Sequence, residues 1–396
     1  MKYNFDELTE RRHTNSVKWD ECAQDDILPM WVADMDFRTA PAITEALKRR
    51  VEHGIFGYTL VPESYYEAVS SWFGRRHGWS IEREWIQYTS GVVPALSVIV
   101  KAMTEPGDQV IVQTPVYNCF FSSIRNNQCE VVESPLKRTE CDSGSEAFFT
   151  YEMDFDDLER KAANPRAKLL ILCNPHNPAG RVWTAEELKR AGDICRRHGV
   201  VVVSDEIHCE LVAQGHKYVP FASIDDDCLN NSITCNSPSK AFNTAGLQIA
   251  NIICPNKAWR ERIDRAININ EVCDVNPFGV IALQAAYNEG EDWLGQLNAY
   301  IDENYRTLCR TLHDQLPQLP IARLEGTYLV WVDISGLNVS SDALTERLLN
   351  EGRVMVNSGT MYGRLDGEGY IRLNIACPRQ RMAEGLERVL NILRTS

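Results

Sequence analysis

The feature that most restricts the fold of this chain is an unbroken run of four valines at residues 200–203. A short, continuously apolar and β-branched run is typical of a strand at the centre of a parallel sheet, where helices cover both faces. Residues 184–198, just before it, predict an amphipathic helix, because Thr184 and Glu187 match a capping box. Similar runs predict strands at residues 108–113, 167–173, 232–235 and 251–254. This alternation predicts an α/β fold, with a mostly parallel sheet flanked by helices.

The last third of the chain has a different pattern, which predicts a smaller α+β domain. Helices are expected at residues 293–316, 342–350 and 380–393, and strands at 327–333, 353–356 and 370–373. We expect a boundary near residues 285–291, and a loop-rich N-terminal segment that drapes over the other parts. The predicted organisation is therefore a large domain over residues 46–286 and a small domain built from residues 1–45 together with 287–396.

Composition restricts the partners and the compartment. Lys and Arg number 41 and Asp and Glu 55, so the net charge of −14 argues against a surface that coats nucleic acid or a membrane. The chain starts without the apolar core of a signal peptide, and its apolar runs fall short of the roughly 18 to 20 residues that span a bilayer. The 13 cysteines are odd in number and thinly spread, so we expect reduced thiols in the cytoplasm. With neither a CxxC nor an HExxH motif, no metal site is expected.

Polar segments follow three of the predicted strands. They are residues 174–180 (NPHNPAG), 204–208 (SDEIH) and 236–240 (NSPSK). Because ligands of open α/β sheets bind just beyond the carboxyl ends of strands, an amide, a carboxylate and a lysine are expected in one crevice. Residues 90–96 form a glycine-containing turn that opens an apolar helix, and the free backbone N–H groups there suit a phosphate.

Pyridoxal 5′-phosphate is the cofactor that needs this set of groups. Its aldehyde forms a Schiff base with a lysine, and its ring nitrogen requires a carboxylate to stay protonated. Its phenolate oxygen accepts a hydrogen bond from a donor such as an asparagine amide. Its phosphate accepts hydrogen bonds from hydroxyl and backbone N–H groups. The central half of the chain supplies all four kinds of group.

Taken together, these motifs resemble the fold-type I pyridoxal-phosphate enzymes of the class I/II aminotransferase superfamily. Within it, the chain is most similar to the PatB/MalY-type cystathionine β-lyases, on residues 31–37 (WVADMDF), 205–208 (DEIH), 237–248 and 372–379 (RLNIACPR). Aminotransferases of the superfamily often carry tyrosine where His208 stands. The resemblance runs from about Trp31 to Arg379, and it implies a dimer whose sites are shared between subunits.

The resemblance also implies a role for each matching residue. Lys240 would form the Schiff base and take the substrate Cα proton, and Arg372 would grip the substrate carboxylate together with Asn177 and Ala33. Asp205 would pair with the ring nitrogen, and Asn177 would donate to the phenolate oxygen. The remaining residues implied at the cofactor are Tyr117 on the ring face, His208, and, around the phosphate, Gly91, Val92, Val93, Ser237, Ser239 and the Tyr58 of a neighbouring subunit. Tyr58 and Tyr117 are also implied in catalysis.

One position departs from the aminotransferase pattern. Many aminotransferases carry a phosphate-binding arginine eight residues after the lysine, whereas this chain has Gln248 there. The phosphate site therefore loses one positive charge. The departure is more typical of the lyase branch, and it makes the serine hydroxyls, Tyr58 and the helix N-terminus more important for the phosphate.

Simpler interpretations exist for each of these residues taken alone. Lys240 would be a surface lysine, Asp205 a helix cap, Asn177 a turn residue and Tyr117 a core aromatic. Arg372 would be a charge at a strand edge. His208 has two open interpretations, because it either lies beneath Asp205 or lines the cofactor ring. The ordered occurrence of all the motifs favours the functional interpretation.

The predicted activity is cleavage of a carbon–sulfur bond in cystathionine or related cysteine S-conjugates. The products would be pyruvate, ammonia and a thiol, which is homocysteine when cystathionine is the substrate. An aminotransferase with the same cofactor site is the first alternative, because both reactions begin with removal of the Cα proton. A regulatory protein that acts by contact with a partner is the second alternative.

Overall fold

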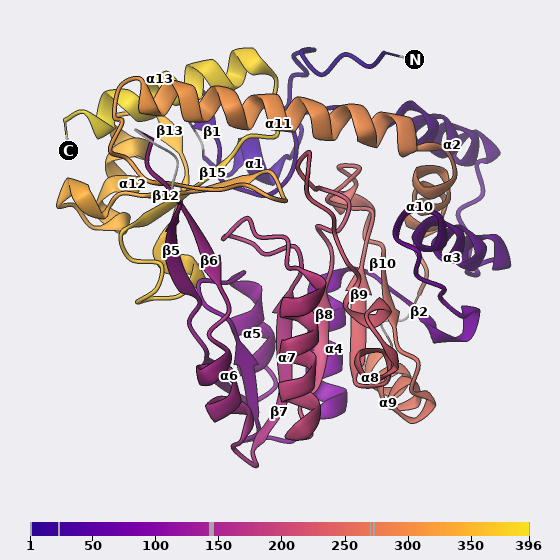
Figure 1. Ribbon diagram of the computed structural model, residues 1–396. Helices are drawn as coiled ribbons and strands as arrows, with labels where there is room; N and C mark the ends of the chain where they lie inside the picture. The colour runs from indigo at the N-terminus through magenta and orange to yellow at the C-terminus, as the bar shows by residue number, and fades with distance from the viewer. Residues whose placement is uncertain (1, 23, 142–145, 270, 272–273, 396) are drawn as a thin grey trace.

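The central element of the fold is a seven-stranded sheet, seen in the computed structural model of the chain (Figure 1). The structure describes residues 2–22, 24–141, 146–269, 271 and 274–395. The strand order is β2-β10-β9-β8-β7-β3-β4, and neighbouring strands from β9 to β4 run parallel, whereas β10 is antiparallel to both of its neighbours. The predicted valine strand is β8, with β7 and β9 beside it. The strands are β2 (Ile86–Thr89), β3 (Gln109–Val112), β4 (Glu130–Glu133), β7 (Ala167–Cys173), β8 (Val201–Asp205), β9 (Ser232–Asn236) and β10 (Ala250–Ile253).

Helices cover both faces of this sheet, and α4 and α7 lie on opposite sides of it (Figure 1). The helix predicted after Thr184 is α7, and the Thr184 hydroxyl and Glu187 carboxylate form the expected capping box. Its apolar face buries Leu188, Ala191 and Ile194 against the sheet. The helices of these two layers are α4 (Val92–Met103), α5 (Cys119–Arg125), α6 (Phe155–Ala162), α7 (Ala185–Arg197), α8 (Asp226–Asn230) and α9 (Lys257–Asn268).

A second sheet, of six strands, lies above the first in Figure 1. Its order is β14-β15-β12-β11-β6-β5, so a hairpin from the middle of the sequence joins strands from the last third. The strands are β5 (Lys137–Cys141), β6 (Phe148–Glu152), β11 (Ile321–Ala322), β12 (Leu329–Asp333), β14 (Asn357–Ser358) and β15 (Tyr370–Asn374), and helices α11 (Glu291–His313), α12 (Ser341–Asn350) and α13 (Arg379–Leu393) pack with them. The strands and helices predicted in this third are therefore present, with ends shifted by a few residues.

The two ends of the chain meet at this second sheet. Strand β1 (Leu28–Pro29) pairs in parallel with β13 (Val354–Met355), and α1 (Val17–Asp20) precedes it. Helices α2 (Pro41–His53), α3 (Glu63–His77) and α10 (Pro277–Glu289) pack together, and α10 leads through Gly290 into α11. The division at residues 46–286 stays a prediction, and the β5–β6 hairpin lies inside that range while pairing with the second sheet.

The hydrophobic core contains large side chains from helices, loops and strands, among them Trp72 of α3, Trp183 before α7 and Trp331 of β12, each fully buried. Among the described residues, none of the helices is both long enough and apolar enough to cross a membrane.

Candidate active site

The carboxyl ends of four neighbouring strands of the central sheet meet at one cavity of about 180 Å³. Asp205 is the last residue of β8, Asn177 follows β7, Lys240 follows β9 and Tyr117 follows β3. From β3 the sheet continues to β4 on one side, and from β7 it continues to β8 and β9 on the other. The strand order therefore reverses between β3 and β7, and α/β proteins bind ligands at such a switch point. The cavity is lined by Ala33, Ser90, Gly91, Val92, Val93, Pro94, Tyr117, Cys173, Asn177, Asp205, Ile207, His208, Ser239, Lys240, Ala245, Gln248 and Ile249.

The Lys240 amine lies at the centre of this arrangement. Its Nζ donates to the carbonyl oxygen of Ala33 at 2.6 Å. Burial lowers the pKa of the amine to about 8, and the positive charge of Arg372 acts in the same direction, while the carboxylates of Asp34 and Asp205 oppose it. A larger share of neutral amine near neutral pH is what a lysine nucleophile or base requires.

The Asp205 carboxyl group is buried, and no cationic side chain of the described residues is bonded to it. Among these residues its one hydrogen-bond donor is the backbone N–H of Ile207, at 3.1 Å. Burial raises the pKa of this carboxyl to about 7, and the charge of Glu206 beside it adds to the rise. A carboxylate in this position is stabilised by a cationic group from outside the chain, such as a protonated ring nitrogen.

The Arg372 guanidinium comes from strand β15 of the second sheet. Its Nη1 donates to Asn177 Oδ1 at 3.0 Å and its Nη2 to the Trp31 carbonyl at 2.8 Å, and the group lies 4.7 Å from the centre of the Tyr362 ring. Its Nε is buried and has no hydrogen-bond partner in the described residues. Because Asn177 accepts from Arg372 through its oxygen, its amide N–H groups remain to donate to a ligand.

His208 lines the cavity, and its role at the cofactor stays a prediction. Its ring lies edge-on to the Tyr328 ring, with centroids 6.1 Å apart, and its Nδ1 has no hydrogen-bond partner among the described residues. Burial lowers the pKa of the imidazole well below its usual value, and the charges of Lys240 and Arg372 lower it further. The ring is therefore neutral, with one nitrogen able to accept or donate toward a ligand.

The backbone at the start of α4 forms one wall of the cavity. Gly91 is the N-cap, and Val92 and Val93 are the first helical residues, so their N–H groups have no partner inside the helix. Ser239 also lines the cavity, whereas the Ser237 hydroxyl donates to the Ile249 carbonyl at 2.5 Å and accepts from the Ser239 N–H at 3.1 Å. Ser237 therefore shapes the turn that carries Ser239 and Lys240. The donor set at the helix start suits an anion such as a phosphate.

Tyr58 lies apart from the cavity of its own chain. It is 97% exposed, and Ile55, Phe56 and Leu60 beside it are also exposed. Tyr117, by contrast, lines the cavity, and burial raises the pKa of its phenol, as does the nearby Cys119 thiol. Sequence reasoning included Ser90 in the turn that opens α4 without giving it a role of its own, and it did not identify Tyr328, whose hydroxyl donates to the same Ala33 carbonyl as Lys240. Tyr328 lies at the start of a strand in the second sheet and carries no strand-end signal.

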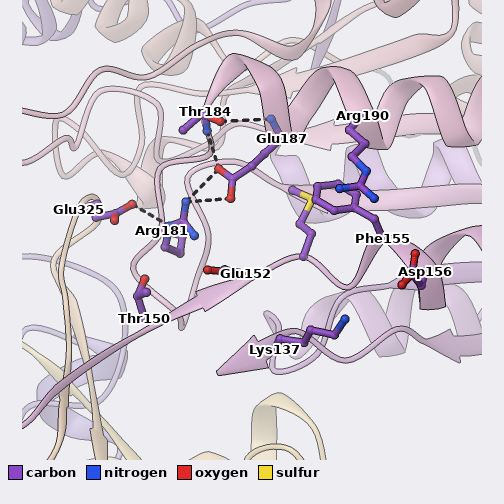
Figure 2. A pocket seen from close by; sticks show the side chains of 11 residues that line it. Lys137, Thr150, Glu152, Phe155, Asp156, Arg181, Thr184, Glu187, Arg190 and Glu325 are labelled. Carbon is purple, nitrogen blue, oxygen red and sulfur yellow. Dashed lines mark hydrogen bonds and ion pairs between the residues drawn. The ribbon is translucent and has the colours of Figure 1, made fainter. Parts of the chain in front are cut away.

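A larger groove of about 560 Å³ lies elsewhere, between the β5–β6 hairpin and the start of α7 (Figure 2). Figure 2 shows Arg181 held between Glu187 and Glu325, with N–O distances of 2.9 Å to each carboxylate. The predicted site residues do not line this groove. The volume of a cavity therefore does not identify the site, whereas the chemical groups that line the smaller cavity do. Within the part of the chain that the structure describes, no cluster of side chains is suited to hold a metal ion.

The residues of the smaller cavity fit pyridoxal phosphate by the chemistry of their donors. A lysine amine with lowered pKa, a buried carboxyl with raised pKa, an amide with free N–H groups and a helix start surround one space. His208 Nδ1 and Arg372 Nε are among the buried polar atoms that have no hydrogen-bond partner in the described residues, and the charge of Arg372 lowers the pKa of the His208 imidazole. These groups match the ring nitrogen, phenolate, aldehyde and phosphate of the cofactor.

Comparison with known proteins agrees with this chemistry. Residues 25–389 match the family model described as aminotransferase class I and II. The chain is 45% identical over 390 residues to cystathionine β-lyase PatB of Bacillus subtilis (strain 168), covering 98% of each protein. It resembles the crystal structure of cystalysin from Treponema denticola, which contains pyridoxal 5′-phosphate, with a TM-score of 0.93, 34% identity and full coverage of both chains. A PLP-bound C–S lyase from Staphylococcus hominis matches with a TM-score of 0.89 and 36% identity, over 99% of each chain.

Proposed function

Because this chain belongs to the class I and II aminotransferase family, we propose that it is a pyridoxal-phosphate-dependent carbon–sulfur β-lyase. It cleaves cystathionine or related cysteine S-conjugates to pyruvate, ammonia and a thiol, which is homocysteine when the substrate is cystathionine. The observation that carries this proposal is the placement of Lys240, Asp205 and Asn177 around one cavity, with Arg372 bonded to Asn177 at its edge. The relatives named cystathionine β-lyase and C–S lyase support the choice of reaction.

The cofactor supplies the electron sink that makes the substrate Cα proton acidic. Lys240 would attach it, Asp205 would keep its ring nitrogen protonated, and Asn177 and His208 would face its polar ring substituents. Gly91, Val92, Val93 and Ser239 would hold its phosphate, with Ser237 shaping the turn. Tyr117 would cover one face of the ring. Each of these residues except Ser237 lines the cavity.

The substrate is an amino acid, and its carboxylate is the group that Arg372 is suited to bind. A guanidinium forms two parallel hydrogen bonds with a carboxylate, and the Asn177 amide and the Ala33 backbone lie close enough to contribute. When the carboxylate and the amine of the substrate are held in place, only the orientation of the Cα–H bond remains to be set. Lys240 then removes that proton at its Nζ.

Cleavage requires the Cβ–S bond to break, with the electron pair leaving on sulfur. The thiolate is protonated by Lys240, which carries the proton taken from Cα, or by a nearby tyrosine such as Tyr117. The remaining three-carbon fragment takes up water and yields pyruvate and ammonia. Atoms and protons therefore balance with water as the only co-substrate.

The decisive experiment is incubation of the purified protein with cystathionine and no keto acid. Release of pyruvate and homocysteine at equal rates supports the lyase. Turnover only when a keto acid is added would instead assign the protein as an aminotransferase. A protein that binds no pyridoxal phosphate would contradict both activities and leave the regulatory alternative.

The homodimer is also part of the proposal. Tyr58 lies in a run of exposed apolar residues with Ile55 (66% exposed), Phe56 (56%) and Leu60 (87%). Exposed apolar side chains grouped in this way are typical of a surface covered by a partner. A second copy of the chain would cover them and receive Tyr58 at its phosphate site.

Subunit mixing tests the shared site. Tyr58→Phe in one subunit and Lys240→Ala in the other place both defects in one of the two sites of a hybrid dimer. The second site then has both native residues, so mixed dimers recover activity above that of either parent. Failure to recover activity, with mixed dimers verified by mass spectrometry, would assign Tyr58 a role within its own chain.

The cytoplasmic location belongs to the proposal as well. The cysteines of the described ranges form no disulfide bond with one another, and most of them are buried. Free buried thiols are typical of proteins in a reducing compartment. Fractionation of cells that express the tagged chain tests this, with recovery in the soluble cytoplasmic fraction as the expected result.

A further inference from the structure

Within the described residues, the carbonyl oxygen of Ala33 accepts two hydrogen bonds, and the proposed chemistry uses only one of the two donors. The first donor is Lys240 Nζ, at 2.6 Å, and the second is the hydroxyl of Tyr328, at 3.0 Å. Tyr328 is fully buried, directly before strand β12, and its hydroxyl is therefore committed to this acceptor. The phenol and the amine lie at most about 5.6 Å apart, the sum of the two bonds.

The Ala33 carbonyl is not free to rotate, because side chains bind the carbonyls on both sides of it. The donors come from the N-terminal segment, the central sheet and the second sheet alike. The bonds to the neighbouring carbonyls are Arg372 and Asn357 to Trp31, Asn374 to Val32, Lys18 and Asn374 to Asp34, and Arg11 and Asn243 to Met35. The segment 31–35 is thus a rigid frame that presents one carbonyl to the lysine.

We propose that Tyr328 is a positioning residue for Lys240, acting through the carbonyl oxygen of Ala33. This inference rests on the proposed role of Lys240. The amine has to hold one direction while it receives and returns a proton, and its four-carbon stem has many rotamers. A carbonyl oxygen has two acceptor sites, so the Tyr328 hydroxyl occupies one and leaves the other for the amine. The amine then donates one hydrogen to Ala33, and its remaining positions face the cavity.

The Tyr328 hydroxyl also weakens the hydrogen bond between the Ala33 carbonyl and the charged form of the Lys240 amine. Two donors share the electron density of one oxygen, so the bond to an ammonium group is weaker than it would be with a single donor. Removing the hydroxyl therefore favours the charged form of Lys240 and raises its pKa. The charged and titratable groups that face this amine are Asp34, Arg372, Asp205, Cys119 and His208, and they stay in place in the variant.

The test compares Tyr328→Phe with a matched control, Tyr305→Phe. Tyr305 also donates its hydroxyl to a backbone carbonyl, that of Ala322 at 2.8 Å, and it lies in α11 away from the cavity. The first readout is the rate at which the cofactor-free protein attaches pyridoxal phosphate as a function of pH, because only the neutral amine attacks the aldehyde. The second readout is kcat and KM for cystathionine in the holoenzyme.

We expect Tyr328→Phe to move the midpoint of the attachment profile upward by about half a pH unit, a threefold change in the amine equilibrium. We expect kcat to fall roughly 10- to 100-fold with KM within about twofold, since a misdirected base slows proton transfer without weakening substrate binding. Tyr305→Phe leaves the midpoint and kcat unchanged. An unchanged midpoint together with an unchanged kcat in Tyr328→Phe would overturn the proposal.

If Tyr328→Phe folds poorly, a second substitution at the same position tests the proposal. Replacing Tyr328 with 3-fluorotyrosine keeps the ring and strengthens the hydroxyl donor, so the midpoint is expected to move downward; a constant midpoint overturns the proposal. A separate measurement shows whether the proposed function itself fails. If Lys240 does not attach the cofactor, Lys240→Ala attaches pyridoxal phosphate as rapidly as the native protein.

Discussion

Two buried aspartates of this protein have opposite electrostatic surroundings. Asp205 and Asp36 are 3% and 2% exposed, respectively. Asp36 accepts hydrogen bonds from Arg11 at 2.8 Å, Trp19 at 2.8 Å and Lys18 at 3.1 Å. Although burial disfavours its charge, these groups outweigh burial and lower the pKa of Asp36, whereas the pKa of Asp205 is raised to about 7.

The difference separates a structural carboxylate from a functional one. The chain satisfies Asp36 completely with its own cations, and this fixes the N-terminal segment on the rest of the molecule. Within the described part of the chain, Asp205 has a single backbone donor, so the remaining stabilisation has to come from a bound cationic group.

The largest effect is expected from Lys240→Ala. Loss of the amine removes both the covalent attachment and the base, so activity falls more than about a thousandfold, equivalent to about 4 kcal/mol. The visible absorbance of bound cofactor on the purified protein also disappears. The exposed Lys101 provides the control, since Lys101→Ala keeps both properties. Retention of activity by Lys240→Ala would contradict the assigned site.

The next effect is on stability and concerns Asp36→Asn. Removing the negative charge leaves the buried Lys18 amine and the partly buried Arg11 guanidinium with the carboxylate of Asp34 but without that of Asp36, so the free energy of unfolding falls by about 3 kcal/mol. Chemical denaturation measures this loss. The control is Asp6→Asn, which breaks the exposed ion pair of Asp6 with Arg379 and costs less than about 1 kcal/mol. Equal losses in both variants would mean that the buried network adds no special stability.

For Asp205→Asn in the cofactor-free protein we expect the free energy of unfolding to change in the opposite direction, toward higher stability. The pKa of the Asp205 carboxyl is about 7 in the folded protein and 3.8 in the reference state, so the contribution of this group to stability is complete below pH 3.8 and is lost as the pH rises through 7. Above pH 7 the variant is therefore more stable than the native protein, because the buried amide carries no charge. Unfolding measured at pH 5 and at pH 8 shows the crossover. A variant less stable than the native protein at pH 8 would remove the contrast with Asp36.

The smallest effect is expected from Arg372→Lys. Lysine keeps the charge but not the paired N–H groups, so KM for cystathionine rises about tenfold, equivalent to about 1.4 kcal/mol, with a smaller change in kcat. The matched control is Arg11→Lys, which changes one of the donors to Asp36. It lowers the melting temperature and leaves KM for cystathionine unaltered. Steady-state kinetics and thermal unfolding of both variants decide the outcome. A raised KM in Arg11→Lys would show that the two networks are coupled.

Much of the site was predictable because its residues lie at the ends of parallel strands. Asn177, Asp205 and Lys240 each come at the end of, or shortly after, a strand that the alternating α/β pattern predicts, so the sequence places them at one edge of a sheet. Tyr328 was not predictable, because its role depends on a carbonyl 295 positions away in the sequence. The hydroxyl of Ser237 was expected at the phosphate, but the turn geometry directs it to the Ile249 carbonyl.

By itself, the sequence determined the α/β class, the order of the strands along the chain, the capped helix α7 and the residue types that one cofactor requires. These follow from local periodicity and from the chemistry of single residues, which the order of amino acids contains directly. Only the tertiary structure decided which strands are neighbours, that the β5–β6 hairpin joins the second sheet, and that Asp36 is neutralised while Asp205 is not. The physical reason is that pairing and burial depend on groups far apart in the chain, and burial is what sets the pKa of each carboxyl.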